Sequence, residues 1–353
     1  MSNKYTEQDL AEIFELNSQG YSQRKIAEIT GVPKSSIGDI LTGKPQYVQE
    51  FMGNKASTPA SAIFMADEFF VEPITKPFNI TKDIYHIVTS TKVGSDVVHL
   101  MIPDTQCKPN IDMTYLDVLG QYIVDKQPDV IIHIGDHADM PSLSSYDKGK
   151  RTAEGKRVQA DIEASIEGMN RLLKPLHDLQ QSQLEEYGEV KYKPKMVLTL
   201  GNHEQRIERH VDANPELHGF LSYDSLKYKE MGWEVYDFLQ PAIVNGVSYV
   251  HYMANPMSGK PYGGMAMNVL KNVGESFCMG HKQTLDIATR FLPSSGKQQW
   301  AIIAGAYYSH DESYKGYQGN HHWRGIVVQH NVKDGTFNPM FVSLDYLLER
   351  YGE

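Results

Sequence analysis

From residue 95 onward, the chain alternates short apolar runs with polar clusters, and the runs have the length of β-strands. Apolar positions at helical spacing separate the early runs, over residues 112–126 and 154–182. Strands that alternate with helices are typical of an α/β domain with a largely buried sheet. The later runs have shorter connections, which predicts a mixed sheet, and Asp334-Gly335 between two apolar runs predicts a hairpin. The predicted strands are residues 97–102, 129–134, 195–200, 247–252, 276–279, 300–308 and 325–330.

The beginning of the chain has the spacing of three short helices instead. Leu10, Ile13 and Phe14 repeat at i, i+3 and i+4, which predicts one apolar helix face. Ser22 can cap a second helix, and Gly31 can provide the turn before a third. Two short helices joined by a glycine turn form a helix-turn-helix pattern.

These patterns divide the chain into three segments. We predict a helix-turn-helix domain over residues 1–45 and an α/β domain over residues 95–353. Residues 46–94 show no clear period and are predicted to be a linker and a lead-in segment. A length of 353 residues agrees with about two domains, at ~150 residues each.

Composition narrows the class of protein. Hydrophobic residues make up 41% and charged residues 22%, which excludes disordered, collagen-like and coiled-coil proteins. Two cysteines, Cys107 and Cys278, are too few for a disulfide framework or a cysteine-based zinc site. No apolar stretch approaches the ~18 residues of a membrane span, and the first residues lack a signal-peptide pattern. We therefore expect a cytoplasmic protein without membrane contact.

Side chains able to bind metal ions follow five of the predicted strands, at the point where each strand ends. The carboxyl ends of sheet strands converge on one crevice, so we expect these side chains to lie close together. Packing alone does not explain five such strand ends in succession. The residues are Asp104 and Gln106, then Asp136, then Asn202 and His203, then His251, and finally His281 and Gln283.

The order of these motifs, with GD at 135–136, GNHE at 201–204 and GHKQ at 280–283, resembles the calcineurin-like metallophosphoesterase superfamily. The resemblance covers about residues 97–330, and GNHE after a strand is its most specific element. The stretches that begin SLSSYDKGK and YYSHDESYK further resemble a branch commonly encoded by bacteriophages. The resemblance implies a sandwich of two mixed β-sheets flanked by helices.

The resemblance also implies a role for each matching residue. Asp136 would bridge two divalent metal ions, and His203 would assist the leaving group or stabilise the transition state. Asn202, His251 and His281 would complete one ion's site, and Asp104, Gln106 and Gln283 would complete the other.

Two positions depart from the family pattern, because Gln106 and Gln283 stand where the family has histidines that bind one ion. An amide oxygen is a neutral and harder ligand than imidazole, so this site should favour Mg²⁺ or Mn²⁺ over Zn²⁺. We expect two ions. The alternative is a site with one ion, or an inactive site.

Several other residues near these motifs are candidates for the active site. His137 could face the substrate or make a supporting hydrogen bond. Asp139 could orient a histidine, but we favour a cap on the helix that begins near Pro141. His310 could bind substrate or an additional metal ion.

Arg206 and Arg209 follow GNHE at the spacing of one helix face. They could grip phosphates of the substrate. The alternative, which we favour slightly, is a solvated face paired with Glu204 and Glu208.

The stretch GYSQRKIAEITGVPKSSIGDIL resembles the DNA-binding domains of resolvases and invertases. The resemblance implies that the third helix enters the major groove, with Lys34, Ser35 and Ser36 near phosphates or bases. Residues 20–45 carry a net charge of +2, although the whole chain carries −10. The alternative is a helical module for protein contacts.

Together the two resemblances predict a nuclease, a phosphodiesterase that uses a metal-activated hydroxide on nucleic acid. The small domain would bring DNA to the crevice, in the host cytoplasm if a phage encodes the protein. One alternative is a phosphatase or nucleotide phosphodiesterase with a regulatory helix-turn-helix. Another is a non-catalytic DNA-binding regulator with a degenerate metal site.

Overall fold

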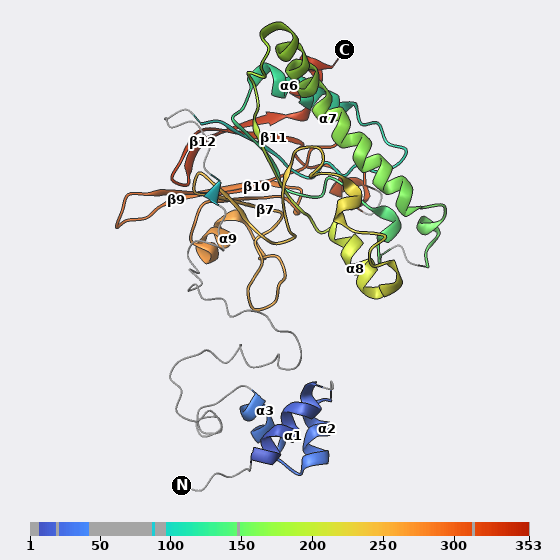
Figure 1. Ribbon diagram of the computed structural model, residues 1–353. Helices are drawn as coiled ribbons and strands as arrows, with labels where there is room; N and C mark the ends of the chain where they lie inside the picture. The colour runs from blue at the N-terminus through green and yellow to red at the C-terminus, as the bar shows by residue number, and fades with distance from the viewer. Residues whose placement is uncertain are drawn as a thin grey trace. The chain divides into compact units, whose positions relative to one another are not determined.

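The computed structural model describes residues 7–18, 21–41, 87–88, 97–146, 149–312 and 315–352 (Figure 1). The chain divides into two compact units, Met1–Phe78 and Asn79–Glu353. The predicted domain boundaries at residues 45 and 94 lie outside the described residues.

The smaller unit contains three helices, α1 (Glu7–Ser18), α2 (Gln23–Thr30) and α3 (Lys34–Leu41). Apolar side chains from the helices and the turn between α2 and α3 form a small core. Its buried members are Ile13, Ile26, Val32, Ile37 and Ile40.

Two residues set the bounds of α2 as the sequence predicts. The Ser22 hydroxyl accepts a hydrogen bond from the Lys25 N–H at 3.4 Å and caps the start of the helix. Gly31 has a φ of 69°, and its N–H donates to the Ala27 carbonyl at 3.1 Å. A left-handed residue at this place stops the helix and favours glycine, which has no Cβ to clash.

The three predicted DNA contacts at the start of α3 differ in their exposure to solvent. Lys34 and Ser35 are exposed, whereas Ser36 is only 8% exposed. Ser36 lies one helical turn before the core residue Ile40, on the buried face of α3. Ser36 is therefore largely covered by the core of this unit, whereas Lys34 and Ser35 lie at the surface, and contact of these residues with DNA stays a prediction.

The larger unit contains two six-stranded sheets. In the first, β2 to β5 run parallel, and β11 pairs antiparallel with both β2 and β12. Its order is β12-β11-β2-β3-β4-β5. The strands are β2 (His99–Ile102), β3 (Val130–His133), β4 (Lys195–Thr199), β5 (Glu234–Tyr236), β11 (Gly325–Lys333) and β12 (Thr336–Ser343).

The second sheet is also mixed, with β7, β8 and β10 parallel and with β6 and β9 antiparallel to their partners β7 and β10. Its order is β1-β6-β7-β8-β10-β9. The strands are β1 (Ile87–Val88), β6 (Ala242–Val244), β7 (Val247–Val250), β8 (Phe277–Met279), β9 (Leu285–Phe291) and β10 (Gln298–Ala304).

The two sheets pack face to face, and helices cover their outer faces (Figure 1). Alternate residues of one strand serve different layers: Leu100 lies in the core under the helices, and Met101 lies in the core between the sheets. Both faces of the strands are buried, which explains their continuous apolar runs. The helices on the first sheet are α6 (Thr114–Lys126), α7 (Val158–Tyr187) and α11 (Leu344–Tyr351), and the helix on the second is α9 (Ala266–Val273). This unit also contains α8 (Gln205–Ala213) and the short α10 (Gly316–Gly319).

The structure confirms a mixed α/β fold with two mixed sheets flanked by helices. Every predicted strand has a counterpart, and so do the two long helices and the hairpin at Asp334-Gly335. The sequence analysis missed β1, which lies in the segment predicted to be linker and lead-in, and it also missed β5, β6, β9, α9, α10 and α11. Of these, β5 and β6 are short, and β9 is an edge strand with polar positions, so neither type carries a strong apolar signal. Among the described helices, none combines the length and the apolar character that a membrane crossing requires.

Candidate metal centre

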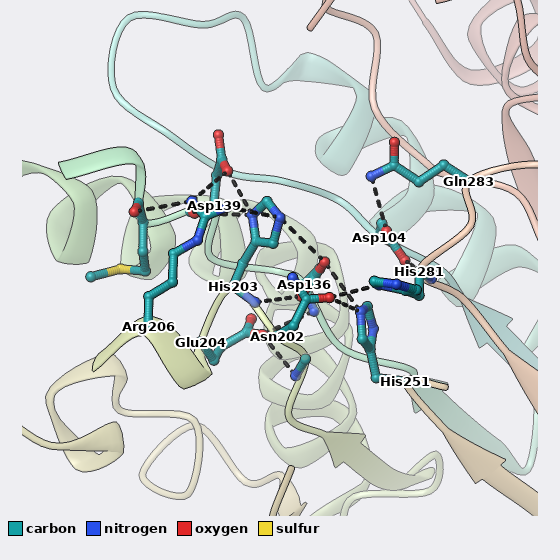
Figure 2. Close-up of polar contacts among 12 residues, drawn as sticks. Asp104, Asp136, Asp139, Asn202, His203, Glu204, Arg206, His251, His281 and Gln283 are labelled. Carbon is teal, nitrogen blue, oxygen red and sulfur yellow. Dashed lines mark hydrogen bonds and ion pairs between the residues drawn. The ribbon is translucent and has the colours of Figure 1, made fainter. Parts of the chain in front are cut away.

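The predicted metal ligands follow the carboxyl ends of strands from both sheets. Strands β2, β3 and β4 run parallel in one sheet, and β7 and β8 run parallel in the other. Figure 2 shows that the segments after these strands bring Asp104, Asp136, Asn202, His251 and His281 together. The five predicted strand ends therefore meet in one place, as expected where parallel strands end at a common edge.

Four of the predicted ligands have a left-handed backbone, which residues other than glycine rarely adopt. The φ angles are 45° for Gln106, 54° for Asp136, 65° for His281 and 54° for Gln283. Each such residue costs of order 1 kcal/mol or more, and such strain is typical of functional sites. The sharp turns of these loops are therefore part of how the site is built.

Two glycines of the sequence motifs allow the carboxylates to approach the neighbouring loops. A Cβ on Gly201 would overlap Oδ1 of Asp136, and a Cβ on Gly280 would overlap Oδ1 of Asp104. Any side chain at either position would displace a predicted ligand. The glycines in GNHE and GHKQ are therefore required by close packing against the carboxylates.

The ligand atoms converge on a common point. One ligand atom each from Asp104, Asp136 and His251 lies within 4.8 Å of the other two, and all three residues are buried. Asn202 Oδ1 lies 2.8 Å from His251 Nε2 and 2.7 Å from His281 Nδ1 (Figure 2). His251 Nε2 also lies 3.2 Å from Asp136 Oδ2. Carboxylate, amide and imidazole donors in such a group can hold a divalent metal ion.

Protein contacts prepare the histidines for this role. His251 Nδ1 donates to the Ile134 carbonyl at 3.0 Å, which leaves Nε2 directed at Asp136 and Asn202. Burial lowers the pKa of His251, but the Asp136 and Asp104 carboxylates and the hydrogen bond to the Ile134 carbonyl together raise it, to about 9. His251 must therefore lose a proton when it binds an ion. Burial lowers the pKa of His281 to about 4, so this ring is neutral at pH 7 and can act as a ligand.

The two carboxylates differ in their net pKa shifts, although burial acts on both in the same direction. Burial raises the pKa of Asp104 above its usual value. It also raises the pKa of Asp136, but His203 and His251 lower that pKa more, so it lies below its usual value. Two buried carboxylates in one cluster are costly without positive charge, and a divalent cation would supply that charge.

The two glutamines differ in their surroundings. The Gln106 side chain is fully buried, and neither its oxygen nor its nitrogen has a hydrogen-bond partner among the described residues. A buried amide without partners is unusual and fits a position where an ion or a water binds. Gln283 Nε2 instead donates to Asp104 Oδ2 at 3.1 Å, and its Oε1 accepts from the Tyr308 hydroxyl at 3.0 Å. As arranged here, the Gln283 amide is not a metal ligand.

His203 lies beside the cluster and is held by Asp139 (Figure 2). Its Nδ1 is 2.7 Å from Asp139 Oδ1, and its Nε2 is 3.7 Å from Asp136 Oδ2. Burial lowers the pKa of His203, but the carboxylates of Asp136 and Asp139 raise it above its ordinary value. The prediction that Asp139 caps a helix is wrong, because the short helix at Pro141–Leu143 receives no side-chain cap. Asp139 orients His203 instead.

Arg206 reaches the same place from the first turn of α8. Its Nη2 donates to His203 Nε2 at 3.1 Å, and its Nη1 donates to the Asp139 carbonyl at 2.8 Å. Arg209 Nη2 donates to the Asn202 carbonyl at 3.1 Å. The favoured prediction of a solvated face paired with Glu204 and Glu208 is wrong for Arg206. Its side chain is 13% exposed and lies against Asp139 instead.

Glu204 is a buried residue that the sequence analysis assigned to a surface pair. Its Oε2 accepts from the N–H of Asp136 at 3.0 Å and of Gly201 at 2.9 Å. Its Oε1 accepts from the N–H of Ala138 at 2.9 Å. Glu204 thus joins the loops after β3 and β4 beneath the metal centre. Its position as the last residue of the GNHE motif is the sequence feature that could have identified Glu204 as part of the site.

Two predicted substrate contacts bond to other groups of the protein. His137 is fully buried, with Nδ1 at 2.7 Å from the Thr105 hydroxyl and Nε2 at 3.0 Å from the Ser165 carbonyl. Substrate contact by His137 is therefore wrong, because both ring nitrogens bond to the interior. His310 Nε2 lies 2.8 Å from Glu312 Oε1, and His310 is not part of the metal-binding group found among the described residues.

A cavity of about 610 Å³ adjoins the cluster. Asn202, Arg206, Arg209 and Tyr252 line it, and the described lining residues include no aspartate or glutamate. Arg206 also pairs with Asp139, but a cavity lined by two guanidinium groups and by no carboxylate is suited to an anion.

Comparisons with known proteins give similarity to phage proteins without a stated activity. The chain is similar to the Gene 54 protein of Mycobacterium phage L5, with 25% identity over 213 residues that cover 58% of this chain and 77% of that protein. The Gene 54 protein of Mycobacterium phage D29 has 24% identity over 213 residues, with the same two shares. A solved structure matches 70% of this chain and 100% of its own chain, with 12% identity and a TM-score of 0.28. This TM-score is too low to indicate a shared fold. No family model matches the chain.

Proposed function

We propose that the larger unit is a metal-dependent phosphoesterase of the calcineurin-like type, and that its substrate is a nucleic-acid phosphodiester. The observation that carries the proposal is the position of His203 beside the buried carboxylate and histidine cluster. Its Nε2 lies 3.7 Å from Asp136 Oδ2, while Asp139 holds its other nitrogen. A metal cluster with an oriented histidine at its edge is the arrangement that phosphate-ester hydrolysis needs.

Of the two predicted ions, Mn²⁺ fits the ligand chemistry better, because imidazole nitrogens are poor ligands for the hard Mg²⁺ ion. Asp136, Asn202, His251 and His281 offer two oxygen and two nitrogen donors. When bound there, the ion supplies positive charge that polarises the phosphate and lowers the pKa of a water ligand.

The chain's own residues would then position the phosphate and move a proton. Water adds to phosphorus, the ester P–O bond breaks, and the leaving oxygen needs a proton. In the neutral ring, Nδ1 donates to Asp139 and Nε2 accepts from Arg206. A phosphate that binds the Arg206 guanidinium draws it away from Nε2. Nε2 is then free to take a proton from solvent, which the raised pKa of His203 favours, and it donates that proton to the leaving oxygen. The water that adds to phosphorus loses its own proton to solvent, so protons balance.

Two features support nucleic acid as the substrate. Arg206 and Arg209 line the cavity beside Asn202, and although Arg206 also pairs with Asp139 at 3.7 Å, the described lining residues include no aspartate or glutamate. The exposed Lys34 and Ser35 begin α3, the helix that by resemblance would enter DNA. The similarity to two mycobacteriophage proteins fits a phage protein acting in the host cytoplasm.

The proposal is tested by hydrolysis of a bis-aryl phosphodiester and of labelled single- and double-stranded DNA. Each substrate is assayed with Mn²⁺, Mg²⁺ or a chelator, for the wild type and for Asp136→Asn and His203→Ala. His177→Ala is the matched control, because His177 is an exposed histidine on α7. We expect metal-dependent cleavage of both substrates that is lost in the two site variants and kept in the control.

Other results would replace the proposal. Cleavage of the small diester without cleavage of DNA would favour a phosphatase or nucleotide phosphodiesterase. DNA binding without turnover in any metal would favour a non-catalytic regulator. Turnover that is equal in the wild type and His203→Ala would remove the role given to His203.

A further inference from the structure

The family resemblance places a second ion beside Asp104, Gln106 and Gln283, but hydrogen bonds occupy this side of the cluster. Gln283 Nε2 donates to Asp104 Oδ2 at 3.1 Å. The backbone N–H of His281 donates to the other oxygen, Oδ1, at 3.2 Å. Both oxygens of the Asp104 carboxylate therefore already accept hydrogen bonds.

Lys315 sets the orientation of the Gln283 amide. Lys315 Nζ donates to the Tyr308 hydroxyl oxygen at 3.0 Å, and an ammonium group can only donate. The Tyr308 proton is thus available for Gln283 Oε1, which lies at 3.0 Å. The amide oxygen then faces Tyr308, and the amide nitrogen faces Asp104. In the opposite orientation, Oε1 would face a carboxylate oxygen, and two acceptors would oppose each other.

This relay brings positive charge toward a buried carboxylate. Asp104 is 0% exposed and Gln283 is 5% exposed, so water cannot screen the interaction. Each donor in the series Lys315, Tyr308 and Gln283 points toward Asp104, so the ammonium charge polarises the bonds in one direction. A cation in a second metal position would have the same effect on Asp104.

Gln106 alone does not make a second site. Its buried amide has no partner among the described residues and could bind an ion. One neutral amide and the two carboxylates of Asp104 and Asp136 are few ligands for a hard cation, which takes six or more oxygens. The nearby Lys315 would also repel it. The other group has four convergent donors, which bond to one another and not to a lysine relay, and an ion that replaces the His251 proton would meet all four.

We propose that this chain holds one divalent ion, at Asp136, Asn202, His251 and His281. The relay from Lys315 through Tyr308 and Gln283 takes the place of the second ion at Asp104. This inference rests on the metal centre of the proposed function, but not on the identity of the substrate.

The test counts ions on the full-length protein with Mn²⁺ as the probe. Metal-free protein is titrated by calorimetry, and bound Mn²⁺ is counted by elemental analysis after gel filtration. Electron paramagnetic resonance distinguishes an isolated Mn²⁺ from an exchange-coupled pair. The variants are Gln106→His/Gln283→His/Lys315→Met, which restores both imidazoles and removes the ammonium, and the matched control Lys333→Met. Lys333 is exposed at the far end of β11.

We expect one Mn²⁺ per chain with the spectrum of an isolated ion, and any second ion at least about 100-fold weaker. The triple variant should gain a second ion and a coupled spectrum, and Lys333→Met should behave as the wild type. Two ions of similar affinity in the wild type, or no bound ion, would overturn the inference without using any variant. A triple variant that folds and still binds one ion would overturn the role of the relay.

Hydrolysis measured on the same samples separates this inference from the proposed function. One bound ion without hydrolysis supports the inference and contradicts the function. Two coupled ions with hydrolysis support the function and contradict the inference.

Discussion

Replacing Glu204 by Gln removes one charge and one acceptor from beneath the metal centre and keeps the size of the side chain. Its carboxylate accepts three backbone N–H groups, from Asp136, Ala138 and Gly201. These three residues belong to the loops after β3 and β4, which carry predicted ligands. The substitution therefore tests whether one buried carboxylate holds the two loops together.

The magnitude follows from counting acceptors. The new amide keeps one oxygen, which can face either side. If its nitrogen takes the Oε2 position, the N–H groups of both Asp136 and Gly201 lose their acceptor. If its nitrogen takes the Oε1 position, one backbone N–H, that of Ala138, loses its acceptor, together with the long 3.5 Å bond from the Tyr228 hydroxyl, which also contacts Ser165, so this orientation costs less. One unsatisfied buried donor, together with the change of two charge-assisted bonds into neutral ones, should cost about 2–4 kcal/mol. That is a large part of a typical stability of about 5–15 kcal/mol.

Urea unfolding followed by tryptophan fluorescence measures this loss. Trp233, Trp300 and Trp323 all lie in the larger unit, so the signal reports on that unit. Glu208→Gln is the matched control on the same helix, and it should stay within about 0.5 kcal/mol of the wild type. A loss below about 0.5 kcal/mol for Glu204→Gln would refute the reasoning, because the three N–H groups would then not depend on the carboxylate.

Four further predictions concern the metal, the histidine, the cavity and the DNA contact. Mn²⁺ at 100 times its Kd should stabilise the wild type by about 2.7 kcal/mol in thermal unfolding, and Asp136→Asn should abolish the shift. Asp139→Asn should lower kcat for the small diester by about 100-fold with little change in KM, because His203 loses its orientation; unchanged kcat would contradict this. Arg209→Ala should raise KM for DNA by about tenfold and leave the small diester unaffected in steady-state kinetics, and equal effects on both substrates would exclude a DNA contact. Lys34→Ala should weaken DNA binding in fluorescence anisotropy and reduce the salt slope by about one, and an identical slope would show that Lys34 meets no phosphate.

The order of strands and helices in the larger unit could be predicted because it depends on local patterns. Strands buried on both faces must be apolar throughout, whatever they pack against, and the runs at β2, β3 and β4 carry that signal. The ligand motifs were predictable for a related reason. Parallel strands end at a common edge, so the residues that follow β2, β3 and β4 meet without further information, whereas those that follow β7 and β8 join them only because the two sheets pack together.

The pairing of individual polar atoms could be decided only by the tertiary structure. His137 and Asp139 are two residues apart in one loop, yet one bonds to the interior and the other holds His203. The orientation of Gln283 depends on Lys315, which reaches it through Tyr308. Hydropathy records whether a segment is buried, but it does not record which distant donor meets which acceptor. Those contacts arise only once the two sheets pack, and they decide which of the predicted residues can bind an ion.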